Sequence, residues 1–161
     1  MSPHYPPDTV YFYAQTDAYS EFSNFAPYGI AMDSAWWRTV EHYFQAQKFH
    51  DAAYRERIRL SNRPKDAKAL GMTRAIPLRP DWEDVKDGIM MEAVTVKFET
   101  HAELAELLLA TGERQIVENA PMDGYWGCGP DGNGLNKLGR ILMTVREKLR
   151  SEAPASVWTP R

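Results

Sequence analysis

Two long segments carry apolar side chains at helical spacing, and they constrain the fold more than any other feature. The longest pattern covers residues 82–100, where apolar positions recur every three or four residues: Val85, Ile89, Ala93 and Val96. The last pattern covers residues 137–150 and places five apolar side chains on one stripe: Leu138, Ile141, Leu142, Val145 and Leu149. A striped helix buries its stripe against other elements, so we expect the last helix to pack against the core.

Shorter elements account for much of the remaining chain. Local start and stop signals predict four more helices: 40–49 after Thr39, 52–60 after Asp51, 64–71 from Pro64, and 102–110. Runs of β-branched and aromatic residues predict short strands at 10–13 and 28–32, and a third strand is expected at 115–117. Residues 151–161 carry two prolines and few apolar side chains, which predicts a flexible C-terminal tail.

The length of the chain allows one domain with one substantial core. The 161 residues are close to the usual size of a single domain, and we expect residues 1–150 to form it. The hydrophobic content of 43% and the charged content of 25% are those of an ordinary globular protein. A formal net charge of −3 gives no overall attraction for nucleic acid, so contact with a long duplex would need a local basic patch.

Cysteine usage and hydropathy indicate the compartment. Cys128 is the single cysteine, which excludes an intrachain disulfide and a cysteine-based zinc site. The first seven residues lack the basic and then apolar pattern of a secretion signal, and no apolar run approaches the roughly 20 residues that a bilayer needs. We therefore expect a cytoplasmic protein without a membrane partner.

One predicted helix carries a polar stripe that suits catalysis. Spacings of four and three put Glu41, Gln45 and Lys48 on one face of the helix after Thr39. From spacing alone the stripe is either a solvated face with loose ion pairs or a partly buried site, which the neighbouring aromatic residues favour. Burial raises the pKa of a carboxylate and lowers that of a lysine, which suits an acid and a nucleophile near neutral pH. His42 faces elsewhere and lacks ligand-type partners at metal-binding spacing, so we expect no metal site.

Three further features are compatible with substrate binding. The Asn24 amide lies in a turn sequence, where it either stabilises the turn or reads a nucleobase edge or ribose hydroxyl. The glycine-rich loop 127–134 is either simply flexible or holds a phosphate with its backbone N–H groups. Its spacing matches neither a Walker A loop nor a dinucleotide-binding GxGxxG motif. Just before it, Asp123 and Trp126 pair a carboxylate with an aromatic platform.

Three motifs together resemble those of the YbiA-like family, also called NADAR. They are SNFAP at 23–27, EHYFQAQKF at 41–49 and YWG followed by GNGLNKLGRILM within 125–143, and the resemblance covers roughly residues 10–150. It implies an α+β fold, a single helix-rich domain with a small β-sheet, and chemistry without a metal or cofactor. The family includes N-glycosidases that hydrolyse phosphorylated intermediates of riboflavin biosynthesis and members that remove ADP-ribose from guanine in nucleic acid.

The resemblance also implies roles for individual residues. Functional roles would fall to Glu41, Trp82, Asp123 and Trp126, with Asn24, Lys48 and Asn136 as neighbours in the pocket. From the polar stripe and the glycine-rich loop we add Lys48 to the catalytic residues, and Gln45 and Gly127 to the substrate-binding residues Asn24 and Asn136. The chain departs from the family at Ser34 and Arg38, where glycine and proline are common, and at Cys128, where an acidic residue is common. These departures bear on the approach to the pocket and on the choice of substrate.

The expected reaction is hydrolysis of the nitrogen–ribose bond of a phosphorylated ribosylamino-pyrimidine, a nucleoside-like small molecule. Glu41 would act as acid or base, and Lys48 would attack the anomeric carbon to form a Schiff base. Asp123 would instead steady the cation or orient water, and the two tryptophans would stack on the base. Two alternatives remain open: hydrolysis of ADP-ribosyl-guanine in nucleic acid, and a non-catalytic module that binds ADP-ribose or a nucleotide.

Overall fold

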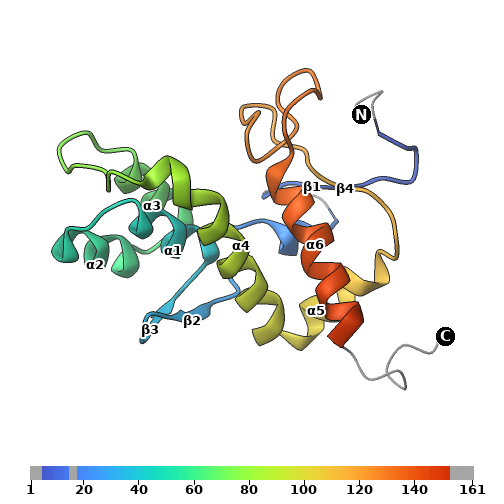
Figure 1. Cartoon of the computed structure of the whole chain (residues 1–161), viewed down its shortest axis with the longest axis horizontal. Helices are drawn as coiled ribbons and strands as arrows, with labels where there is room; N and C mark the ends of the chain where they lie inside the picture. Colours follow the sequence, from blue (N-terminus) through green and yellow to red (C-terminus); the bar gives the residue numbers. More distant parts are fainter. Residues whose placement is uncertain (1–4, 15–17, 153–161) are drawn as a thin grey trace. The chain divides into compact units, whose positions relative to one another are not determined.

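The structure, a computed structural model, describes residues 5–14 and 18–152 (Figure 1). These residues belong to two compact units. Unit 1 comprises the chain up to Ser23 and from His101 onward, whereas unit 2 comprises Asn24–Thr100. Both units contain helices and a pair of short strands, so the protein has the predicted mixed α+β, helix-rich fold.

Unit 2 contains a hairpin and four helices: β2 (Ile30–Met32), β3 (Ala35–Trp37), α1 (Val40–Gln47), α2 (Ala52–Leu60), α3 (Pro64–Gly71) and α4 (Trp82–Thr100). β2 and β3 are antiparallel, with Ile30 opposite Trp37. Asp33 and Ser34 turn the chain between them with φ values of 53° and 61°, the left-handed conformation that two-residue hairpin turns require. Helix α1 packs against α2, α3 and α4, which makes it the core helix of this unit (Figure 1).

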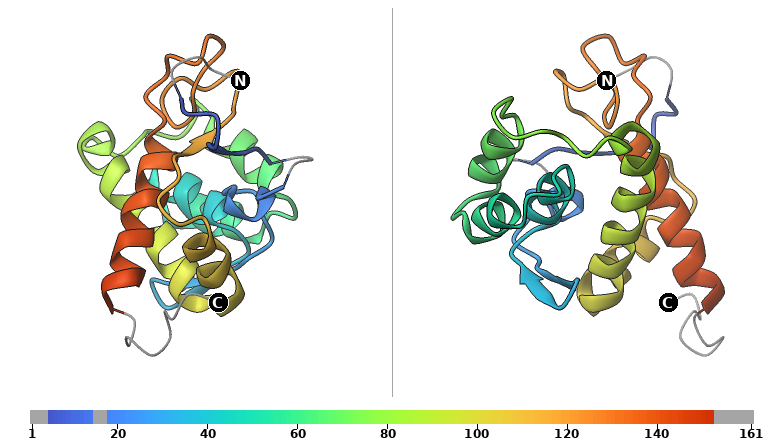
Figure 2. Two further views of the ribbon diagram at one scale, coloured as in Figure 1. Left: turned by 90° about the vertical axis from the view of Figure 1, so that its right-hand side faces the viewer. Right: turned by 60° about the vertical axis from the view of Figure 1, so that its left-hand side comes forward.

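Unit 1 contains β1 (Val10–Phe12), a 3-10 turn at Ser20–Phe22, α5 (Ala102–Ala110), β4 (Ile116–Glu118) and α6 (Lys137–Glu152). The two strands are parallel, with Val10 opposite Ile116. Helix α6 packs against β4 and α5. It buries four residues of its predicted apolar stripe, whereas Leu149 is only half-buried. The loop between β4 and α6 lies at the N-terminal end of α6 (Figure 2), where the Leu138 N–H donates to the carbonyl oxygen of Trp126.

The predicted helices and strands are confirmed, with small shifts at their ends. Two elements were not predicted: strand β3 and the 3-10 turn. In β3, Trp37 is buried and Trp36 is exposed, so the period of two spans only three residues and gives little signal. Residues 151 and 152 of the expected tail belong instead to α6, which continues to Glu152. The rest of that tail, residues 153–161, lies outside the described residues.

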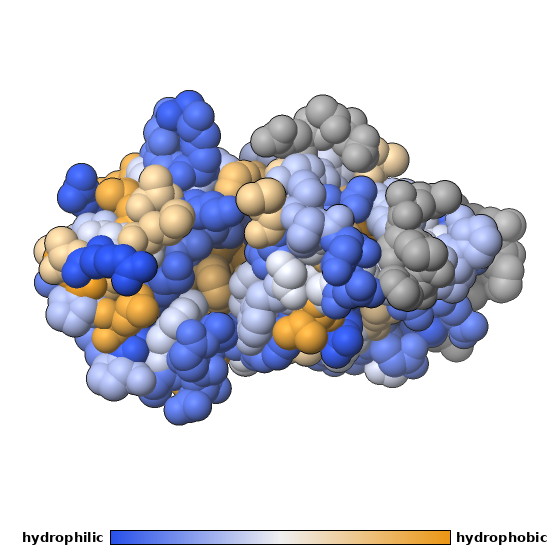
Figure 3. Space-filling model, turned by 90° about the horizontal axis from the view of Figure 1, so that it is seen from above, coloured by the Kyte–Doolittle hydropathy of each residue, from blue (hydrophilic) through white to orange (hydrophobic). Residues whose placement is uncertain are grey.

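The face of the molecule drawn in Figure 3 is largely hydrophilic. In the view of Figure 3, hydrophobic surface is divided into small patches by hydrophilic surface. Such dispersed side chains are normal for a globular protein. None of the helices in the described residues combines the length and the apolar character needed to cross a membrane.

Candidate active site

Glu41 is a buried carboxylate in the first turn of α1. The Thr39 hydroxyl caps this helix by accepting the N–H of His42 at 3.1 Å, which is the usual role of threonine at this position. The Glu41 N–H donates to the carbonyl oxygen of Asn24 at 3.1 Å. Its side chain is only 7% exposed, and Oε2 accepts the Nε2 of Gln45 at 2.7 Å. The carboxylate is therefore fixed by its own helix, as spacing of four residues predicted.

Lys48 follows α1 and is partly buried. Its Nζ donates to the carbonyl oxygen of Gly71, 3.3 Å away at the end of α3. Burial lowers the pKa of the Lys48 ammonium; the Glu41 carboxylate opposes this shift, while Lys68 and Lys86 add to it. A lysine with a lowered pKa is neutral more often near pH 7, which is the condition for attack on carbon. The expectation that the polar stripe is partly buried is confirmed.

Trp82 packs against the same helix. Its ring centroid lies 5.0 Å from that of Phe44 on α1, and the backbone N–H of Trp82 donates to the carbonyl oxygen of Arg79. The Arg79 N–H in turn donates to the carbonyl oxygen of Lys48 at 2.7 Å. These contacts hold the start of α4 beside the end of α1, so unit 2 brings Trp82 and the polar stripe together. Trp82 is buried, and its stacking on a substrate base remains a prediction.

Two amide oxygens near Glu41 are buried and lack a hydrogen-bond partner: Asn24 Oδ1 and Gln45 Oε1. The Asn24 Nδ2 has a thioether as its acceptor, the Sδ of Met90 at 3.4 Å, and sulfur is a weak acceptor. Buried polar groups are nearly always satisfied in folded proteins. Unsatisfied acceptors beside a buried carboxylate are therefore groups that a ligand hydroxyl or N–H would satisfy.

Asp123 and Trp126 lie close together in unit 1. Asp123 Oδ1 accepts the backbone N–H groups of both Tyr125 and Trp126 at 2.9 Å, which fixes one carboxylate oxygen in a turn. The Trp126 and Tyr125 rings meet edge to face, with centroids 4.8 Å apart, and the Lys137 ammonium lies 4.7 Å from the Tyr125 centroid. The predicted pair thus occurs in one turn, with Trp126 half-buried.

The glycine-rich loop is ordered by Asn136. The Asn136 Oδ1 accepts the N–H of Glu118 at 3.0 Å, and Nδ2 donates to the carbonyl oxygen of Ile116 at 3.0 Å. The carbonyl oxygen of Gly127 accepts the N–H of Asn136 at 3.0 Å. These bonds give Asn136 a structural role between the loop and β4; its predicted contact with substrate, and that of Gly127, remain predictions.

Cys128 is a buried thiol in this loop. Its Sγ lies 3.5 Å from Asn119 Oδ1, and burial raises the pKa of the Cys128 thiol. A raised pKa keeps the sulfur protonated at neutral pH, and the thiol is a weak nucleophile. Cys128 therefore does not supply the negative charge that is common at this place in the family.

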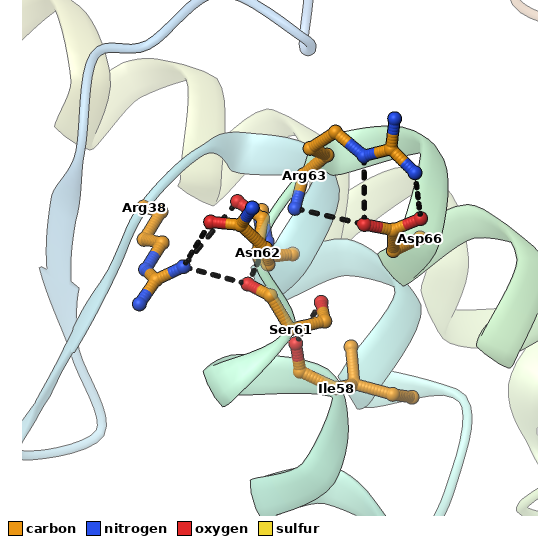
Figure 4. A network of polar contacts seen from close by, with 7 residues as sticks. Arg38, Ile58, Ser61, Asn62, Arg63 and Asp66 are labelled. Atoms are coloured by element: carbon orange, nitrogen blue, oxygen red, sulfur yellow. Dashed lines mark hydrogen bonds and ion pairs between the residues drawn. The ribbon is translucent and has the colours of Figure 1, made fainter.

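Arg38, the second departure from the family, ties the start of α1 to the turn between α2 and α3. Its Nη1 donates to the carbonyl oxygens of Ser61 and Asn62 at 3.0 and 3.3 Å (Figure 4). Nearby, Arg63 and Asp66 form a two-point ion pair at 3.0 Å. Ser34, the third departure, lies in the hairpin turn described above. Arg38 thus has a structural role here that proline could not perform.

His42 is completely buried, and both of its ring nitrogens have partners. Nε2 lies 3.0 Å from the carbonyl oxygen of Ser61, and Nδ1 lies 2.8 Å from the Thr39 hydroxyl. A carbonyl oxygen only accepts, so Nε2 carries the proton and Nδ1 accepts from Thr39. His42 is therefore a core histidine whose two ring nitrogens are both satisfied. Within residues 5–14 and 18–152, no three His, Cys, Asp or Glu side chains cluster as metal ligands would.

Comparison with known protein families decides the affiliation. The NADAR domain family matches residues 11–150. The chain belongs to the NADAR domain family. In the solved structures, the NMR structure of the Escherichia coli protein YbiA superposes with a TM-score of 0.83 and 46% identity, covering 98% of this chain and 93% of that one.

Two curated relatives of this NADAR domain are similar along nearly their whole length. N-glycosidase Npun_R5314 of Nostoc punctiforme is 50% identical over 146 residues, or 89% of this chain and 94% of that protein. N-glycosidase YbiA of Escherichia coli K12 is 49% identical over 150 residues, or 92% of this chain and 94% of that protein. The chain is accordingly an enzyme of the N-glycosidase class, a hydrolase that acts on N-glycosyl bonds.

Sequence reasoning missed several residues around Glu41. Gly71 contacts Lys48 through its carbonyl, and a Cβ at this position would collide with Gln45 Oε1. Lys68 and Lys86 act on Lys48 through their charge. All three are on helices that are distant in sequence from Glu41, so no spacing pattern links them to α1.

Proposed function

We propose that the protein hydrolyses the N-glycosidic bond of a phosphorylated ribosylamino-pyrimidine intermediate of riboflavin biosynthesis. The observation that carries the proposal is the buried Glu41 carboxylate, held by Gln45 and close enough to Lys48 to act on its charge. Support for the substrate comes from relatives in that pathway. Riboflavin biosynthesis protein VVA0006 of Vibrio vulnificus is 39% identical over 145 residues, which cover 90% of this chain and 40% of that protein.

Glu41 is the proposed general acid. The bond between nitrogen and the anomeric carbon breaks heterolytically, and the nitrogen base needs a proton as it leaves. Glu41 supplies that proton, while the sugar carbon develops positive charge. One oxygen of Glu41 is fixed by Gln45, so the carboxyl group is oriented before the substrate arrives.

Lys48 is the proposed nucleophile. Its neutral amine attacks the anomeric carbon, the base leaves with its proton, and the sugar ring opens to a protonated imine on Lys48. One water molecule then hydrolyses the imine, which releases the sugar phosphate and restores the amine. The alternative is direct attack of that water, with Glu41 accepting its proton. On the family resemblance, we propose that Asp123 stabilises the positive charge that develops on the sugar carbon. Trp126 would stack on the base.

The single cysteine, buried and unable to pair within the chain, agrees with a reducing compartment. On this ground we propose the cytoplasm as the compartment of the reaction. No cofactor is required by the proposed steps.

The test is to incubate the purified protein separately with the ribosylamino-pyrimidine phosphate and with an ADP-ribosylated guanine oligonucleotide. Released sugars are then identified by mass spectrometry. We expect ribose 5-phosphate from the first substrate. Release of ADP-ribose from the second, with no turnover of the first, would assign the protein to nucleic-acid repair instead. Tight binding of either substrate without release of sugar would contradict the catalytic proposal.

A further inference from the structure

The charges of two lysines from other helices of unit 2 act on Lys48, as does the charge of Glu41. Lys48 directly follows α1, Lys68 lies on α3 and Lys86 lies on α4. Helix α1 packs against both of the other helices. The ammonium groups of Lys68 and Lys86 both act electrostatically on that of Lys48, as does the Glu41 carboxylate. The chain thus brings positive charges together, although its net charge is −3.

Lys68 reaches this region from α3. It precedes Gly71 by three residues, so both lie on one face of the helix, and the Gly71 carbonyl accepts the Lys48 ammonium. The Lys68 Nζ lies 6.0 Å from the centroid of the Phe25 ring. Phe25 follows Asn24, whose backbone carbonyl accepts the N–H of Glu41. Lys68 is exposed, and its contact with Phe25 places its ammonium near the segment that is bound to the start of α1.

Lys86 reaches the same region from α4. It follows Trp82 by four residues, and such residues share a helix face; Trp82 itself packs on Phe44 of α1. The Lys86 side chain is only 17% exposed, although it forms an ion pair with Glu83, which is 78% exposed. Exposed ion pairs contribute little to stability. The ion pair with Glu83 by itself is therefore a weak restraint on the Lys86 ammonium.

The lysine ammonium groups and the unsatisfied amide oxygens suit two different parts of one ligand, a phosphate and a sugar. The charges of Lys68 and Lys86 both oppose the positive charge of Lys48, so an anion held between these ammonium groups would relieve their repulsion. A phosphate accepts hydrogen bonds from several lysines at once. The buried oxygens Asn24 Oδ1 and Gln45 Oε1 lack donors, and sugar hydroxyls are donors.

We propose that Lys68 and Lys86 form the subsite that binds the 5-phosphate of the sugar, while Asn24 and Gln45 accept hydrogen bonds from its hydroxyls. The inference rests on the proposed function for the identity of the sugar phosphate. It assigns to Lys68 and Lys86 the selection of phosphorylated over unphosphorylated substrate. Lys48 keeps its separate role beside Glu41.

The test measures binding without turnover. Isothermal titration calorimetry with ribose 5-phosphate and with ribose compares the wild type with Lys68→Ala, Lys86→Ala and the double variant. Lys65→Ala is the matched control, because Lys65 is exposed on the same helix as Lys68. Each lysine is expected to contribute about tenfold to the affinity for ribose 5-phosphate, the usual scale of a hydrogen bond to a charged group. Affinity for ribose should be unchanged in every variant, and thermal unfolding should show all of them folded.

Equal binding of ribose 5-phosphate by the wild type and the double variant would overturn the proposal. So would an equal loss in the Lys65→Ala control, which would mean that general charge is responsible. ADP-ribose distinguishes the source of the phosphate. If the variants weaken the binding of ADP-ribose but not that of ribose 5-phosphate, the subsite holds a pyrophosphate and its assignment to a monophosphate is wrong. If the wild type binds ribose 5-phosphate through these lysines yet turns over no riboflavin intermediate, the subsite stands and the proposed function fails.

Discussion

A carboxylate is seldom buried unless other groups hold it, and Glu41 is held by three local features. It lies at the N-terminal end of α1, where the helix dipole favours negative charge. Its backbone N–H is bound to Asn24, and its side chain is bound to Gln45. Such restraint at a buried acid favours a catalytic function over a purely structural one, because an isosteric amide would be easier to bury.

Glu41→Gln should therefore lower kcat by about 100-fold or more, since general acid–base catalysis typically contributes 10²–10⁴ in rate. The substitution keeps the size of the side chain, so we expect the thermal midpoint to stay constant or rise. Steady-state kinetics and thermal unfolding give the two readings. Glu56→Gln, an exposed change on α2, is the control. Unchanged kcat with unchanged stability would show that the carboxylate has no catalytic role.

Lys48 offers a direct test of the covalent route. Because burial lowers its pKa, the neutral amine becomes available at a lower pH than for an ordinary lysine, and kcat should rise with pH through that lowered pKa. Borohydride added during turnover should reduce the imine and leave a permanent mass increment on the protein. Lys48→Arg should abolish the increment, because arginine keeps the charge but cannot form the imine. Robust turnover without any adduct would favour attack by water.

At the scale of single elements, α3 contributes to the site through a missing side chain. Gly71 lies at the end of α3, and a Cβ there would collide with Gln45 Oε1. Gln45 is buried, so it has little freedom to move without releasing Glu41. The close approach of α3 to α1 thus depends on glycine at this position.

Gly71→Ala should lower kcat by about tenfold or more, since small displacements of catalytic groups are costly. Gly88→Ala on α4 is the matched control, because nothing lies within 4 Å of a Cβ there. In the control, the helix preference for alanine should raise the free energy of unfolding by up to about 1 kcal/mol, with kcat unchanged. The two variants are compared by kinetics and by urea unfolding. An unchanged kcat in Gly71→Ala, as in the Gly88→Ala control, would show that Gly71 has no positioning role.

The start of α1 should also be sensitive to acid. Burial lowers the pKa of His42; the bond to Ser61 opposes the shift, the charge of Arg38 adds to it and that of Asp66 opposes it. The unfolded chain therefore binds a proton at His42 at a higher pH than the folded protein does. Stability contributed by neutral His42 is present above the unfolded pKa of about 6.5 and is lost as pH falls through the lowered folded pKa.

We expect the free energy of unfolding to fall in that window in the wild type. His42→Asn should flatten this dependence, although it lowers the overall stability. His50→Asn, at an exposed histidine, should leave the dependence intact. Urea unfolding between pH 4 and 7 provides the measurement. A His42→Asn variant with the wild-type pH profile would assign the effect to other groups.

The sequence predicts the elements well because their signals are local. Thr39 and Asp51 accept the backbone N–H groups expected of helix caps, and Pro64 begins α3. The stripe from Glu41 to Lys48 could be predicted for the same reason. The positions of Lys68 and Lys86 beside it could not, because they depend on how α3 and α4 pack against α1. No pattern within a single helix encodes that packing.

For the whole molecule, the balance of charge bears on the size of the substrate. A duplex binds through many lysine and arginine contacts along its phosphates, each of which releases counterions. This chain has 19 basic and 22 acidic residues. A local group of lysines is suited to one phosphate, whereas the net charge of −3 opposes a long array of them.

Duplex DNA should therefore fail to compete with the small substrate. Turnover of the ribosylamino-pyrimidine phosphate is measured at low and at physiological salt, with and without an excess of a 20-base-pair duplex. At each salt concentration we expect the same kcat/KM with and without the duplex, because the duplex would make too few favourable contacts to bind the enzyme. Heparin, a polyanion of higher charge density, serves as a control for non-specific binding. Inhibition by the duplex that weakens steeply with salt would reveal a phosphate-tracking surface. That result would favour ADP-ribosylated guanine in nucleic acid as the substrate.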